Sequence, residues 1–343
     1  MIKLFSSARL LTLVALVMLT NFSASASLSF SWTDQDKKEL EISEAEAKAA
    51  GEVEAAADAA AKVAAATTFA QKYAKSTLRP KIAEHVGAHI THVKDPGQRV
   101  KLAEELQKLF SEPGEVDVVR RVVIDAYASS DRLDEAFALT ATALTASPED
   151  VWLLARMASA GTEAAKRQNR KFVTNALQYG TKAIELIEAN KKPANLDDAT
   201  WTSQKGMLPR LYQDMGILSF VNKDLTAAMA RFQKAVTLEP RDPMNYAMIA
   251  TIFDEEYQQS AQAYQQMAAG SQKDELLKKI NEQLDQAIDW YARAIGVATG
   301  RPEFQPLLNQ ALQNVTPYYK YRHNNSTEGL QALIDKYKPA AQP

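Results

Sequence analysis

Three of the four histidines in this chain, His85, His89 and His92, lie close together. On a helix they would occupy positions i, i+4 and i+7 and share one face. Imidazole pairs at i, i+4 can bind zinc or copper, so these three residues form a candidate metal site. The metalloprotease pattern H-E-x-x-H is absent, because Val86 stands where the glutamate base would be. Structural histidines, or histidines that sense pH, fit the same spacing.

Other signatures of catalysis are missing from the sequence. It contains no G-x-x-x-x-G-K-[ST] phosphate loop, no G-x-G-x-x-G and no G-x-S-x-G motif. It contains no cysteine, which excludes disulfides, thiolate metal sites and cysteine nucleophiles. Adjacent carboxylates such as Glu104 and Glu105 fit solvated helix faces. We therefore predict that the protein is not an enzyme and needs no cofactor.

We expect helices to carry these side chains. Glycine is scarce in the sequence, and the helix-forming residues Ala, Leu, Gln, Lys and Glu are abundant. We expect an all-α fold. The histidines fall in a first helix over 67–91 that Pro80 would kink or break. A second helix is expected over 98–110, after a turn at Asp95-Pro96-Gly97. A helix is also expected from Asp197 or Asp198 to Val221.

The N-terminal residues 1–26 are typical of a secretory signal peptide. Lys3 and Arg9 precede an apolar run over 10–19, and a small-x-small cleavage site ends at Ala26. Ten apolar residues are too few to span a bilayer, which needs about 20. We therefore expect an exported protein, in the periplasm or outside the cell, with no stable transmembrane span after cleavage.

An Ala- and Glu-rich arm follows the signal peptide over 27–66. Its composition favours one long helix, but it has few large apolar residues to pack. A solvated helical spacer and a docking arm or shallow coiled coil both fit this pattern. The formal net charge of the chain is −2, and loss of Lys3 and Arg9 makes it −4. A nucleic-acid partner would need a basic face, so we expect none.

The clearest pattern occupies residues 209–242. Large, small and aromatic residues follow one another there in a fixed order: Tyr212, Met215, Gly216, Ala228, Phe232, Ala235 and Pro240. This order resembles the tetratricopeptide repeat (TPR) family. Weaker copies occur at 117–150 and at 243–300, where an insertion lengthens both expected helices. The resemblance implies a TPR-like solenoid of helical hairpins over 67–338, preceded by the Ala-rich helix.

In TPR proteins the first helix of each hairpin lines a concave groove that binds a partner. Carried over by repeat position, this predicted groove is lined by Arg121, Asp125, Trp152, Arg156, Arg210, Gln213, Ile217 and Phe220. Arginines in a groove can grip carboxylates or extended peptides. We therefore predict an exported scaffold or adaptor for a protein or peptide partner. The alternatives are a small-molecule-binding, glycan-binding or metal-binding helical protein, and the chain could also form a homo-oligomer.

Overall fold

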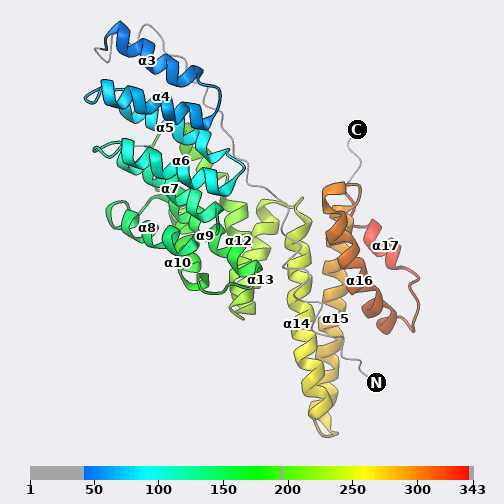
Figure 1. Ribbon diagram of the computed structural model, residues 1–343. Helices are drawn as coiled ribbons and strands as arrows, with labels where there is room; N and C mark the ends of the chain where they lie inside the picture. The colour runs from blue at the N-terminus through cyan, green and yellow to red at the C-terminus, as the bar shows by residue number, and fades with distance from the viewer. Residues whose placement is uncertain (1–41, 194–195, 340–343) are drawn as a thin grey trace. The chain divides into compact units, whose positions relative to one another are not determined.

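The computed structural model describes residues 42–193 and 196–339, and every regular element in these ranges is a helix (Figure 1). The expected all-α fold is confirmed. The described residues form two compact units, one up to Ala160 and one from Gly161. The boundary falls inside helix α9 (Val151–Lys166). The expected signal peptide at 1–26 and the start of the arm lie outside the described residues.

The described part of the first unit contains six helices ahead of α9: α3 (Glu44–Ala55), α4 (Ala59–Lys72), α5 (Arg79–Thr91), α6 (Pro96–Leu109), α7 (Val116–Ser129) and α8 (Leu133–Ala146). Short polar side chains fix several of their starts. Asp58 accepts a hydrogen bond from the Ala61 amide at 2.9 Å, and Asp95 accepts one from the Gln98 amide at 2.6 Å. Such N-caps satisfy amides that have no partner inside the helix.

The described part of the Ala- and Glu-rich arm, residues 42–66, belongs to two helices rather than to the single long helix expected. The chain is extended at Ala56, and Asp58 then caps the start of α4. Ala50 and Val53 of α3 are buried with Val63 of α4 in the core of the first unit. These helices are therefore packed elements of that unit, which differs from a solvated spacer.

The expected helix over 67–91 is also divided. α4 ends at Lys72, and α5 begins at Arg79 with Pro80 in its first turn. Proline suits a first turn because its missing amide would have no helical partner there. The next helix, α6, starts at Pro96, close to the expected 98–110.

The second unit contains the end of α9 and the following helices: α10 (Val173–Glu188), α11 (Asp198–Lys205), α12 (Leu208–Val221), α13 (Leu225–Leu238), α14 (Pro243–Gln266), α15 (Ser271–Ala298), the 3-10 turn η2 (Pro302–Phe304), α16 (Gln305–Arg322) and α17 (Leu330–Asp335). The helix expected to end at Val221 is interrupted between α11 and α12, and Pro209 falls in the first turn of α12. Asp197 is the N-cap of α11 and accepts a hydrogen bond from the Thr200 amide.

Hairpin α14–α15 is longer than the other hairpins, as the sequence predicts. Its helices have 24 and 28 residues, and Figure 1 shows the pair reaching beyond α16. Ile280, Leu284 and Tyr291 of α15 are fully buried in the core of the second unit. Both helices are therefore extended as a packed pair, so the insertion does not form a loop.

Candidate functional site

The histidine cluster brings two of its three imidazoles together. His85 and His89 lie on α5 with ring centroids 4.6 Å apart. Nδ1 of His89 lies 2.9 Å from the carbonyl oxygen of His85 and donates to it. His92 follows the last residue of α5 and is exposed, with Nδ1 at 2.8 Å from the carbonyl oxygen of Ala88.

His85 is partly buried and lies near His89 and Lys62. Its Nε2 is buried and finds no hydrogen-bond partner among the described residues. Burial, followed by the neighbouring His89 and Lys62, lowers the pKa of His85 to about 4. The buried Lys62 side chain donates to the carbonyl oxygens of Val53 and Glu54. Across residues 42–193 and 196–339, no group of three His, Cys, Asp or Glu side chains could hold a metal ion.

The predicted groove residues of the first unit do meet one another. Both Nε and Nη2 of Arg121 on α7 donate to Oδ2 of Asp150, at 3.0 and 2.7 Å. The guanidinium carbon of Arg121 also lies 5.9 Å from the ring centroid of Trp152 on α9. Asp150 itself accepts a hydrogen bond from the Leu153 amide at the start of α9. Asp150 thus joins the Arg121 side chain on α7 to the first turn of α9.

A second bridge runs between the same two helices. Nε of Arg156 donates to Oδ1 of Asp125 at 2.6 Å, and its Nη2 donates to the Ser129 hydroxyl at 3.0 Å. Both charged groups of this pair are partly buried. Arg121 is 42% exposed, so it is the predicted arginine in this unit that solvent reaches most easily.

In the second unit, Arg210 of α12 is the centre of a charged cluster. Its Nε lies 3.0 Å from Oδ1 of the fully buried Asp214, and its Nη2 lies 3.2 Å from Oε1 of Glu163. The same Glu163 oxygen lies 2.6 Å from Nζ of Lys166. Asp214 is the main reason that the pKa of Arg210 is raised, whereas burial lowers the pKa of Lys166.

Gln213 extends this cluster to α14. Its amide nitrogen donates to Oδ2 of Asp242 at 2.6 Å and to Oδ1 of Asn245 at 3.0 Å. Asp242 also caps α14 by accepting a hydrogen bond from the Met244 amide. Burial raises the pKa of Asp242. Gln213 is itself buried, so it ties helices together rather than facing solvent.

Two residues expected in the groove belong to the apolar core. Ile217 is fully buried and Phe220 is 6% exposed, and both contribute to the core of the second unit. Their side chains do not line an accessible surface. They lie on α12, most of whose residues are buried, so repeat position alone misplaces them.

Sequence reasoning missed Asp150, Glu163 and Lys166. Asp150 pairs with Arg121 in the first unit, and Glu163 pairs with Arg210 and Lys166 in the second. Glu163 and Lys166 are three residues apart on one helix, a spacing that places opposite charges side by side. Asp150 directly precedes α9, where capping residues are common. The sequence contains both patterns, but neither pattern indicates which arginine of another helix each side chain contacts.

Successive helix pairs, α7–α8, α12–α13 and α14–α15, coincide with the three clearest repeats of the sequence. Gly216 and Phe232 meet where α12 crosses α13, as the repeat pattern requires. The fold is TPR-like. No family model and no curated protein matches the chain.

A search of solved structures found a crystal structure of a tetratricopeptide repeat protein from Parabacteroides merdae ATCC 43184. It is 15% identical, with a TM-score of 0.41, and the match covers 81% of this chain and 99% of that chain. Within the described part of the TPR-like chain, no helix is long and apolar enough to cross a membrane.

Proposed function

We propose that this chain is a non-catalytic, exported scaffold that binds a protein or peptide partner through the first helices of its hairpins. The TPR-like arrangement supports this function because each hairpin must stack on its neighbours, and stacking presents a row of first helices. The export part of the proposal is supported by the sequence of residues 1–26 alone.

One observation carries the proposed binding surface. Arg121 is held against Trp152 by its ion pair with Asp150, yet 42% of its side chain is exposed. Arginine and tryptophan are enriched among residues that dominate binding energy at protein interfaces. An arginine already fixed in position loses less side-chain entropy on binding than a free one. The Arg121–Trp152 pair is therefore the anchor that we assign to the partner surface.

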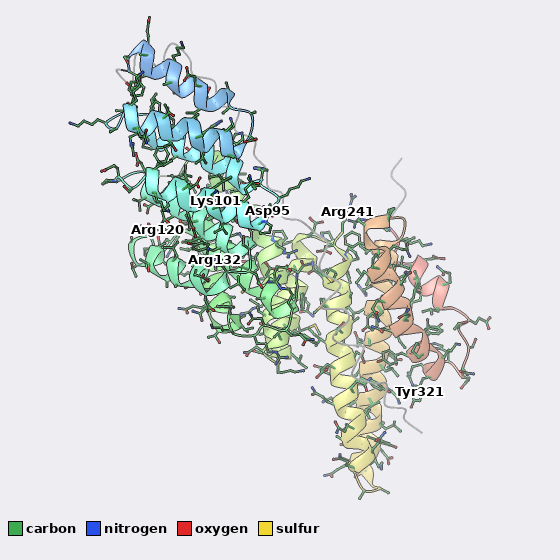
Figure 2. The ribbon with its side chains drawn as sticks, viewed as in Figure 1. Asp95, Lys101, Arg120, Arg132, Arg241 and Tyr321 are labelled. Atoms are coloured by element: carbon green, nitrogen blue, oxygen red, sulfur yellow. The ribbon has the colours of Figure 1, made fainter. Side chains whose placement is uncertain are left out.

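Crosslinking and affinity capture from the source cells test this proposal. The full chain is compared with an Arg121→Gln/Arg156→Gln variant and with a matched Arg120→Gln control. Arg120 lies on the same helix, is labelled in Figure 2, and pairs with the exposed Asp117. We expect a partner that the control retains and the double variant loses. Capture of the same proteins by all three chains, or of none by the unchanged chain, contradicts the proposal.

Sequencing of the mature N-terminus tests export separately. We expect the chain recovered from an envelope or secreted fraction to begin near residue 27. Recovery of an intact N-terminus from the cytoplasm contradicts export without affecting the binding proposal.

A further inference from the structure

His85 and His89 lie on successive turns of α5, and both side chains are partly buried. Four residues separate the two positions, so both side chains leave the same face of the helix. Their ring centroids are 4.6 Å apart, and the ring planes are tilted by 48°. Nε2 of His85 is buried and has no hydrogen-bond partner among the described residues. Nearly all buried polar atoms in folded proteins have a partner, so a ligand that contacts this nitrogen would explain it.

The backbone of α5 fixes the tautomer of His89. Its Nδ1 lies 2.9 Å from the carbonyl oxygen of His85, which can only accept a hydrogen bond. The proton of the neutral His89 ring is therefore on Nδ1, and Nε2 carries the lone pair. Histidines that bind metals commonly donate their other ring nitrogen to a carbonyl group, because that hydrogen bond sets the orientation of the ring. His89 therefore has the hydrogen-bonding pattern of a metal ligand that binds through Nε2.

The spacing of the two rings indicates which ion they suit. An imidazole nitrogen binds copper or zinc at about 2.0 Å, so two rings that meet one ion at a right angle have centroids about 4.5 Å apart, against about 5.2 Å at the tetrahedral angle. The observed separation of 4.6 Å is close to the first value. Right angles between neighbouring ligands are typical of tetragonal Cu²⁺, whereas Zn²⁺ prefers a tetrahedral arrangement. Rotation about the side-chain bonds can direct one Nε2 from each ring to the ion.

We propose that His85 and His89 bind a Cu²⁺ ion through their Nε2 atoms, with water molecules at the remaining positions. The pair supplies only two ligands, because the described part of the chain has no group of three His, Cys, Asp or Glu side chains that could hold a metal. The ion links two successive turns of α5 and thereby stabilises the first unit. Neither Arg121 nor Trp152 takes part, so this site goes beyond the proposed scaffold function.

Lys62 opposes the binding of a cation at this site. Its side chain is buried, and Nζ donates to the carbonyl oxygen of Val53 at 3.2 Å. Its positive charge is one of the causes that lower the pKa of His85. A proton on His85 gains one bond against this repulsion, whereas Cu²⁺ gains two, one from each ring. The repulsion still weakens binding, so the site should release its ion to a strong chelator such as EDTA.

Isothermal titration calorimetry of the full, untagged chain with copper(II) chloride, in a weakly coordinating buffer, tests the proposal. We expect one Cu²⁺ ion at the tightest site, weaker binding of Zn²⁺ and no binding of Mg²⁺, which prefers oxygen ligands. Pulsed electron paramagnetic resonance should detect two imidazole nitrogens on the bound copper. Cu²⁺ should also raise the unfolding temperature of the chain, because it binds only the folded helix.

The decisive variants are His85→Gln and His89→Gln. Each removes one of the two ring nitrogens and should weaken Cu²⁺ binding by about tenfold or more. The matched control is His323→Gln. Nδ1 of His323 also lies 2.9 Å from the carbonyl oxygen four residues earlier, that of Tyr319, but the other three histidines all belong to the first unit. A single imidazole is a weak copper site, so the control should change the affinity by less than about twofold.

Three results overturn the proposal. The first is a folded His89→Gln variant that binds Cu²⁺ as tightly as the unchanged chain. The second is an equal loss of affinity in His323→Gln, which would show adventitious binding to surface histidines only. The third is a loss in His92→Gln without a loss in His85→Gln, which would place the ion between His89 and His92.

Circular dichroism checks that each variant is folded. If His85→Gln does not fold, His89→Gln decides by itself, because its affinity and the number of imidazole nitrogens on its copper can still be measured. None of these results changes the scaffold proposal, which depends on the capture of a partner.

Discussion

Gly216 of α12 lies directly against the ring of Phe232 on α13, so that a Cβ atom at position 216 would come within 2.7 Å of Cε1 of Phe232. Phe232 is fully buried, so its rigid ring can move away only by displacing other side chains of the close-packed core. The close approach of the two helices in this hairpin therefore depends on the absence of a side chain at one residue.

Gly216→Ala should destabilise the second unit by about 1–3 kcal/mol, because an overpacked core shifts side chains and backbone. Urea unfolding followed by circular dichroism measures this change. Gly51→Ala is the matched control, since Gly51 is also inside a helix but has no atom within 4 Å of the position that a methyl group would take. The control should be stabilised by about 0.5–1 kcal/mol. Equal unfolding midpoints for Gly216→Ala and the unchanged chain would show that the hairpin tolerates a methyl group there.

Glu115→Gln should cost the first unit about 3–5 kcal/mol, the usual penalty for breaking a buried ion pair. Glu115 is 2% exposed and accepts hydrogen bonds from Nε and Nη2 of Arg79, at 2.6 and 3.1 Å. Asp117→Asn removes the partner of Arg120 at an exposed position and should change stability by less than about 0.5 kcal/mol. Thermal unfolding compares the stability of the two variants. Similar losses of stability would contradict a larger contribution from the buried pair of Glu115 and Arg79.

His85 should make the stability of the first unit depend on pH. The pKa of His85 is lowered to about 4 in the folded chain, against an ordinary value of 6.5. The unfolded chain binds the proton more readily, so this contribution is fully present above pH 6.5 and is lost as the pH falls towards 4. With allowance for its partial exposure, the loss is about 1–2 kcal/mol. His85→Leu should flatten this part of a stability profile, and an unchanged slope in that variant would assign it to other groups.

Tyr318→Phe should destabilise the second unit by about 1–3 kcal/mol, because it removes a buried donor from a carboxylate. The Tyr318 hydroxyl donates to Oδ1 of Asp254 at 2.5 Å and joins α16 to α14. Tyr321 lies on the same helix but is 38% exposed, and Figure 2 labels it near the end of α16. Tyr321→Phe should therefore change stability by less than about 0.5 kcal/mol. Chemical unfolding compares the two variants, and equal effects would contradict a specific role for the Asp254 contact.

The sequence by itself determined the helical class and the repeat hairpins. Helix-forming composition, capping aspartates and the order of residues from Tyr212 to Pro240 act over one or two helices, so a linear pattern can report them. The same local logic predicted the lengthening of α14 and α15. It failed at the Ala-rich arm, where Ala56 and Asp58 divide one expected helix into two.

Only the tertiary structure decided which predicted groove residues face solvent and which charges meet. Ile217 and Phe220 share α12 with Arg210, yet they are buried while Arg210 is partly exposed. The difference arises from how α12 is rotated against the helices packed on it, chiefly α10 and α13. The contact of Arg210 with Glu163 spans 47 residues and depends on the same rotation, which no local pattern records.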